Sequence, residues 1–123
     1  MKQFIDPYNQ RDFQKIANLL DEHAVFNFVE QSSKEYGKNT IMKASLASTQ
    51  KETRQQNIFV YEQLLWGKKA LIYVTTSNNN RNILYDVNLL EVEDEKIINW
   101  HSYYFCRDFM KNAANELGLL LES

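Results

Sequence analysis

The residues best suited to chemistry in this sequence are Asp86 and Asn88, two positions apart in the strand-like segment 82–93. Residues at this spacing in a strand share a face. A carboxyl group among apolar side chains holds its proton more tightly, as a general acid or base requires. Asn88 could donate to a carbonyl oxygen or a developing enolate. The alternative is an aspartate at a strand end, solvated or paired with Lys or Arg.

The two histidines and the single cysteine are weaker candidates. We expect His23 at the surface before the first strand and His101 on the face opposite Trp100, although a one-residue slip would make His101 a candidate base. Two histidines without Asp or Glu at ligand spacing predict no metal site. Cys106 cannot form an internal disulfide, and we expect a buried structural thiol. No glycine-rich nucleotide loop or G-x-S-x-G elbow occurs, so we predict no cofactor.

Aromatic residues form the second group with a possible role in binding. The sequence has seven Phe, seven Tyr and two Trp, against three Gly and one Pro. Tyr8, Tyr73, Trp100 and Tyr104 could form a cage for a flat apolar ligand, with phenol groups supplying hydrogen bonds. The alternative is that they fill the core.

Length and charge limit the class of protein. The 123 residues fit one domain, 1–123, and 14 Lys and Arg against 16 Asp and Glu give a net charge of −2. This balance does not favour nucleic acid as a partner, and it suits a pocket that selects by shape and apolarity. No apolar run approaches the ~20 residues of a membrane span, and no signal-peptide pattern occurs. We therefore expect a cytoplasmic protein without a membrane partner.

Periodicity predicts the elements that must position these residues. Apolar spacings of three and four predict two short helices within residues 3–20, with Asp12 as an N-cap and Pro7 near the start of the first. A strand over 24–30 and a helix over 38–50 follow. Strands over 57–66, 69–76, 82–93 and 96–105 form an antiparallel meander, and a last helix ends at Gly118. Helices gathered against one side of such a sheet predict an α+β fold.

Strand 82–93 is apolar on both faces, unlike an antiparallel strand with one wet face. Exposing a large apolar side chain costs ~1.5–3 kcal/mol, so both faces should be covered. Helices can cover one face and a second subunit the other, which predicts a homodimer. Tyr85, Tyr103 and Phe105 are then expected on the dimer face.

The order of elements and several strings resemble the NTF2-like superfamily, in its SnoaL-like branch. The strings are YNQRD at 8–12, LDEHAVF at 20–26, GKNTI at 37–41 and EVEDEKI at 91–97. The ending, from 103 to 119, is similar to the SnoaL-like module appended to some extracytoplasmic sigma factors. Together the strings span nearly the whole chain.

The resemblance implies a cone-shaped α+β barrel, in which a curved antiparallel sheet with N-terminal helices on one face leaves a pocket. It also implies dimers through the outer face of the sheet. Aligned with the family pattern, Leu84 and Leu90 point inward, as do Phe4, Phe26 and Leu71. The pattern gives a candidate site of Asp86 and Asn88 for catalysis, with Tyr8, Phe28, Tyr73, Trp100, Ser102 and Tyr104 for ligand binding.

The sequence departs from the ketosteroid isomerases of this superfamily. Phe28 stands near their catalytic aspartate, Asn88 near the acid of their oxyanion hole and Phe4 near their tyrosine. Steroid-type isomerisation is therefore not expected. The leading hypothesis is a SnoaL-like protein that binds a small apolar or aromatic molecule. The alternatives are a cofactor-free lyase, isomerase or hydrolase using Asp86, and a regulatory or protein-interaction module.

Overall fold

A computed structural model of the chain describes residues 1–77 and 79–121 and has a mixed α+β architecture, which confirms the predicted fold class. The elements, in chain order, are α1 (Lys2–Asn9), α2 (Phe13–Leu19), β1 (Leu20–Phe28), β2 (Lys34–Tyr36), α3 (Lys38–Ile41), η1 (Met42–Leu46), α4 (Ala47–Gln55), β3 (Ile58–Leu65), β4 (Lys68–Thr76), β5 (Asn82–Glu93), β6 (Lys96–Ser102), α5 (Arg107–Leu117) and β7 (Leu120–Leu121).

The two N-terminal helices form as predicted. The Asp12 carboxylate caps α2 by accepting a hydrogen bond from the Lys15 backbone amide at 3.3 Å. Pro7, however, lies in the second half of α1 rather than near its start. The cost is one helical hydrogen bond, because only the amide that would donate to the carbonyl four residues earlier is missing.

The third helical segment is longer than the sequence predicts. It runs from α3 through the π-helical turn η1 into α4 and ends at Gln55 rather than at residue 50. Residues 51–55 are polar and none is buried, so they carry no apolar periodicity that could mark them as helical. The π-helical turn covers Met42–Leu46, and two of its residues, Ala44 and Ser45, line a pocket.

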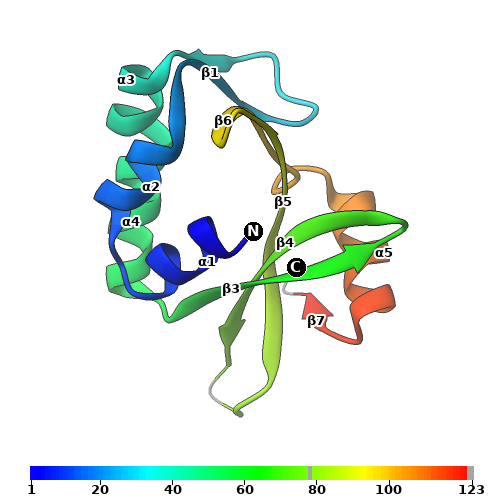
Figure 1. Cartoon of the computed structure of the whole chain (residues 1–123). Coiled ribbons are helices and arrows are strands. Elements are labelled where there is room, and N and C mark those ends of the chain that lie inside the picture. The colour runs from blue at the N-terminus through cyan, green and yellow to red at the C-terminus, as the bar shows by residue number, and fades with distance from the viewer. Residues whose placement is uncertain (78, 122–123) are drawn as a thin grey trace.

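The sheet has the strand order β2-β1-β6-β5-β4-β3, with β7 paired to β5. Strands β3 to β6 form the predicted antiparallel meander, whereas β1 joins β6 in parallel. Sequence patterns missed β2 and β7, which are three and two residues long. In Figure 1 the strongly bent sheet faces α2, α3 and α4, with α1 near the lower end of the space between them. The sheet does not close into a barrel, because its edge strands β2 and β3 do not pair.

A β-bulge at Tyr85 changes which side chains of β5 face the helices. Tyr73 of β4 pairs with Asp86, whereas the next residue, Val74, pairs with Leu84. Tyr85 is therefore the extra residue, and the alternation of side chains shifts there. The prediction that Leu84 points inward is wrong, because Leu84 belongs to the cluster on the opposite side of the sheet.

Helix α5 covers the outer face of the sheet and gives β5 its second apolar environment. Met110, Ala113 and Ala114 of α5 are buried against Leu84 and Val87 of β5. Figure 1 shows α5 on the side of the sheet away from α2 and α4. An intramolecular contact therefore explains why β5 is apolar on both faces. The apolar second face of β5 therefore no longer supports a homodimer, which stays a prediction.

Of the three aromatic residues expected on the dimer face, Tyr103 does lie on the outer side of the sheet, but helix α5 covers it. The Tyr103 ring stacks on Phe109 of α5, with ring centroids 4.0 Å apart. Tyr85 and Phe105 line the pocket on the inner side of the sheet. The bulge accounts for Tyr85. Phe105 lies beyond the end of β6, where the strand alternation no longer applies.

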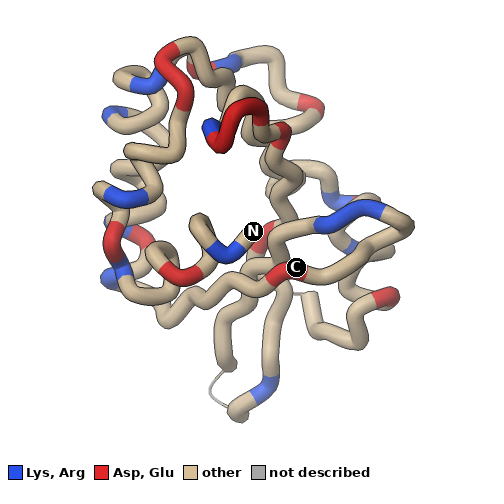
Figure 2. The backbone as a smooth tube through the Cα atoms, in the orientation of Figure 1, with Lys and Arg blue, Asp and Glu red and all other residues tan. Residues whose placement is uncertain are grey.

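The charged residues are distributed along the whole chain (Figure 2). Figure 2 shows Lys and Arg on the outer helices, on the β3–β4 hairpin and on α5, without a single basic face. In the part of the chain that the structure describes, no helix is long and apolar enough to cross a membrane.

Gly118 ends α5 in the left-handed conformation, with φ of 69°, as the sequence predicts. Gly118→Ala should lower the free energy of unfolding by about 1 kcal/mol, because a Cβ atom disfavours this conformation. Gly118→Asn should cost less, since asparagine tolerates positive φ. Urea denaturation of the three proteins measures the difference. Equal stability of the alanine and glycine proteins would contradict this assignment.

Candidate functional site

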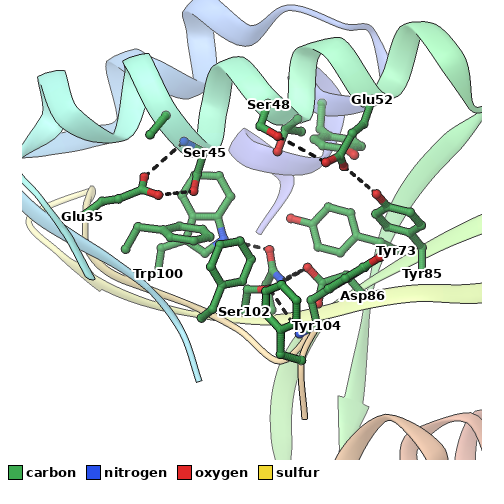
Figure 3. A pocket seen from close by; sticks show the side chains of 17 residues that line it. Glu35, Ser45, Ser48, Glu52, Tyr73, Tyr85, Asp86, Trp100, Ser102 and Tyr104 are labelled. Carbon is green, nitrogen blue, oxygen red and sulfur yellow. Dashed lines mark hydrogen bonds between the residues drawn. The ribbon is translucent and has the colours of Figure 1, made fainter. Parts of the chain in front are cut away.

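A pocket of about 440 Å³ lies between the α3–η1–α4 segment and the inner face of the sheet. This volume is in the range of sites that bind small organic molecules. All eight residues selected from the sequence line it. They are Tyr8, Phe28, Tyr73, Asp86, Asn88, Trp100, Ser102 and Tyr104. Figure 3 shows the pocket, with hydroxyl and carboxyl groups from the helix on one side and aromatic and polar groups from the strands on the other.

Asp86 is held in place by three hydrogen bonds. One carboxylate oxygen, Oδ1, accepts from the Val87 backbone amide at 2.7 Å. The other, Oδ2, accepts from Asn88 Nδ2 at 2.9 Å and from Ser102 Oγ at 2.8 Å. Asn88 and Ser102 are themselves buried, so these donors are fixed. The carboxyl group therefore has a defined position at the pocket wall.

The environment of Asp86 raises the pKa of its carboxyl group to about 7. Burial is the main cause, because removal from water disfavours the charged form. The hydrogen bonds from Ser102, Asn88 and Val87 act in the opposite direction, and the nearby Glu52 carboxylate raises the pKa further. At neutral pH both protonation states are therefore populated, which is the condition for a group that both accepts and donates a proton.

Asn88 positions Asp86 rather than facing the pocket as a free donor. Its Oδ1 accepts a hydrogen bond from Trp100 Nε1 at 2.7 Å, while its Nδ2 donates to Asp86. The Trp100 ring is in turn packed edge-on against Phe4 and Phe26. A chain of contacts thus leads from the aromatic core to the carboxyl group. The proposed donation from Asn88 to a substrate oxygen stays a prediction.

Tyr73 supplies a hydroxyl group that has no partner. Its side chain is 96% buried, at 4% exposure, and it lines the pocket beside Asp86, its partner across the β4–β5 ladder. In the described part of the chain, this hydroxyl is the one buried side-chain polar atom without a hydrogen bond. Burial raises its pKa well above the usual value, so the phenol stays protonated. Buried polar groups are normally paired, so this hydroxyl is available to donate to a polar group that enters the pocket.

Glu35 and Ser45 were not identified from the sequence. Ser45 lies in the π-helical turn and donates to Glu35 twice, from Oγ at 2.7 Å and from its backbone amide at 3.2 Å. Glu35 belongs to β2, in the stretch between the predicted strand at 24–30 and the predicted helix at 38–50, for which no element was predicted. No sequence pattern marks this pair, because it depends on the path of β2 along β1.

Glu52 and Tyr85 form the second contact that sequence analysis missed. The Tyr85 hydroxyl donates to Glu52 Oε2 at 2.5 Å, and Ser48 Oγ donates to Oε1 at 3.3 Å. Burial raises the pKa of the Tyr85 hydroxyl, and the hydrogen bond to Glu52 raises it further. A signal for Glu52 was present, since positions 45, 48 and 52 fall on one helical face. Tyr85 carried none, because the bulge reversed its direction.

The other sequence candidates lie outside the pocket. His23 is exposed in β1, and His101 Nδ1 lies 2.6 Å from Asn27 Oδ1 in β1. The Cys106 thiol donates to the Val29 carbonyl at 3.2 Å, and burial raises its pKa, in agreement with a structural thiol. Among the described residues, no group of three or more His, Cys, Asp or Glu gathers as metal ligands would.

Cys106 should react slowly with a disulfide reagent, because it is 4% exposed and its thiol pKa is raised. We expect modification by 5,5′-dithiobis(2-nitrobenzoate) at pH 7.5 to be at least about 100-fold slower in the native than in the urea-unfolded protein. Absorbance at 412 nm follows the reaction. Similar rates in the two states would show that Cys106 is not held as described.

Comparison of this fold with solved structures gives consistent matches at low sequence identity. An NTF2-like protein of unknown function from Burkholderia xenovorans superposes with a TM-score of 0.59 at 14% identity, over 84% of this chain and 77% of that one. This chain has the NTF2-like fold. No protein-family model matches the sequence, and no curated protein does. At this level of identity the matches establish the fold alone.

Other NTF2-like neighbours carry names of enzymes. A candidate ketosteroid isomerase from Kribbella flavida matches with a TM-score of 0.58 and 18% identity, over 82% of this chain and 71% of that one. An epoxide hydrolase from Mycobacterium tuberculosis matches at 0.55 and 14%, over 94% and 87%. Candidate polyketide cyclases also match. The likeness to a sigma-factor module stays a prediction.

Proposed function

We propose that this NTF2-like protein binds a small organic molecule in the pocket and that Asp86 transfers a proton to or from it without a cofactor. The observation that carries the proposal is the Asp86 carboxyl group, fixed by three donors at the wall of a 440 Å³ pocket and with a pKa of about 7. A general acid–base catalyst is most effective when its pKa lies near the working pH. The activities named for the neighbours, isomerisation, cyclisation and epoxide hydrolysis, are compatible with such a group.

Tyr73 is the natural partner of Asp86 in this mechanism. When Asp86 takes a proton from a substrate, negative charge develops on an oxygen of that substrate. The free, protonated Tyr73 hydroxyl can donate a hydrogen bond to this oxygen without breaking an existing one. Asn88 and Ser102 then act as positioning residues, because they hold the carboxylate rather than the substrate.

The open pocket also supports ligand binding over the alternative of a protein-interaction module. Such a module needs no cavity lined by a perturbed carboxyl group and an unpartnered hydroxyl. Aromatic rings of Phe28, Tyr104 and Phe105 line the pocket and supply apolar contact area. These features support a site for an organic molecule with both a polar group and an apolar part.

The proposal can be tested with a panel of small ketones and epoxides incubated with the protein in buffered D₂O. We expect the wild-type protein to exchange a carbon-bound proton or open an epoxide in at least one compound, seen by NMR. Asp86→Asn should lower that rate at least about 100-fold, the usual contribution of an acid–base group. The exposed control Glu116→Gln on α5 should match the wild type. An Asp86→Asn protein of undiminished rate would overturn the proposal.

A further inference from the structure

The lining of the pocket is acidic and has no compensating positive charge. Glu35, Glu52 and Asp86 contribute carboxyl groups, and none of the described residues that line the pocket is Lys, Arg or His. The described part of the chain gives neither Glu35 nor Glu52 an ion-pair partner. The near-neutral net charge of −2 gave no sign of this, because the Lys and Arg residues that balance the total are not among those that line the pocket.

The two glutamates are held ready to accept further hydrogen bonds. Glu52 accepts from Tyr85 and Ser48, and Glu35 accepts twice from Ser45. A carboxylate has about four lone-pair positions, so each retains acceptor capacity. In Figure 3 Glu52 extends from the helix toward Tyr85, and Glu35 lies next to Ser45 and close to Trp100. Because neutral donors already fix their orientation, a charged donor can bind without reorganising them.

Two independent features point to a ligand at this acidic lining. The Tyr73 hydroxyl is buried without a partner at the same pocket, so it can donate a hydrogen bond to a polar group of a ligand. The aromatic residues Trp100, Tyr104 and Phe105 also line the pocket, and the faces of such rings attract cations. Carboxylates together with aromatic rings are the groups that recognise an organic ammonium ion.

We infer that the ligand of this pocket carries a positively charged amine that binds between Glu52, Glu35 and the aromatic wall. This inference rests on the proposed function and specifies its substrate class. The amine donates to the glutamates, and the apolar body of the ligand lies against the aromatic rings. The Tyr73 hydroxyl remains available to a second polar group of the ligand, close to Asp86.

Three probes that share a phenylethyl body test the inference. They are 2-phenylethylamine, 2-phenylethanol and 3-phenylpropanoate, which carry a positive, a neutral and a negative group. We expect NMR titrations at pH 7 to give a dissociation constant for the amine at least about tenfold below that of the alcohol, with the propanoate weakest. Equal binding of amine and alcohol, tighter binding of the propanoate, or no binding of the amine at 10 mM would each overturn the inference.

Charge-removing variants locate the amine. Glu52→Gln keeps the shape of the side chain, and we expect it to reduce the preference for the amine over the alcohol to less than about threefold. Glu35→Gln should reduce it to a smaller extent, whereas the exposed control Glu116→Gln should leave it unchanged. Comparable circular dichroism spectra would show that the variants fold. An unchanged preference in both pocket variants would overturn the inference.

The amine-binding experiment and the Asp86→Asn experiment test the inference and the proposed function independently. If amine and alcohol bind equally but Asp86→Asn abolishes conversion in the D₂O panel, the pocket is catalytic and the inferred charge selection is wrong. If the amine binds selectively but Asp86→Asn converts the panel as fast as the wild type does, the charge selection holds and the acid–base role fails.

Discussion

Replacing Asp86 by asparagine should remove most of the dependence of stability on pH between pH 5 and pH 8. The carboxyl pKa is about 7 in the folded protein, against ~3.9 in an unfolded chain. Between these values the folded state binds more protons than the unfolded state, so the free energy of unfolding falls as pH rises. The stabilisation is fully present below about pH 4 and is lost as pH rises through about 7.

The size of this effect follows from linkage. One pKa unit corresponds to about 1.4 kcal/mol, and integration between pH 5 and pH 8 gives a loss of about 2.5 kcal/mol from Asp86 alone. Urea denaturation of the wild type and of Asp86→Asn at four pH values measures it. The difference in free energy between the two proteins should change with pH by this amount, in favour of the variant at high pH.

A matched control separates Asp86 from the other carboxyl groups. Glu116→Gln removes an exposed carboxyl group on α5 and should keep the pH dependence of the wild type. If Asp86→Asn loses stability between pH 5 and pH 8 as steeply as the wild type, the pKa of Asp86 is not raised. Asp86 would then be an ordinary ionised carboxylate at neutral pH and not an acid–base group.

Phe4→Ala should lower the free energy of unfolding by about 3–5 kcal/mol, the range for removing a buried aromatic ring. Phe4 is fully buried, and its ring packs edge-on against Trp100 with centroids 5.3 Å apart. Truncation leaves a cavity behind Trp100, whose indole nitrogen fixes Asn88. The variant should therefore weaken both the core and the support of Asp86.

The control for Phe4→Ala is Leu64→Ala, which removes an apolar side chain that is 64% exposed. Its effect should lie within about 0.5 kcal/mol of zero. Urea denaturation at pH 6 compares the two variants under one condition. A loss below 1 kcal/mol for Phe4→Ala would show that α1 does not pack on the pocket wall as described.

Local patterns were sufficient to predict the helices and the meander. Apolar spacings located α1, α2 and α5, and the strand patterns located β3 to β6 to within three residues at each end. The NTF2-like resemblance then supplied the strand register that brings Asp86, Trp100 and Ser102 to one side. Helices and strands could be predicted because the spacing of apolar residues repeats along each element and can be seen in a single sequence.

Features that depend on a single irregularity could not be predicted. The bulge at Tyr85 turns this residue toward Glu52 and turns Leu84 toward α5, and no residue type at 83–86 marks it. The acidic lining was missed for a similar reason, since Glu35 and Glu52 come from elements that meet only in the fold. The second apolar face of β5 was visible in the sequence, but its cover was assigned to another subunit rather than to α5.

The proposed chemistry depends on one carboxyl group, that of Asp86, exchanging protons near neutral pH. The most direct test is a ¹³C NMR titration of the aspartate carboxyl carbons, with the Asp86 signal assigned by its absence from Asp86→Asn. We expect a titration midpoint near 7 for this signal. A midpoint near 4, the ordinary value for aspartate, would contradict it.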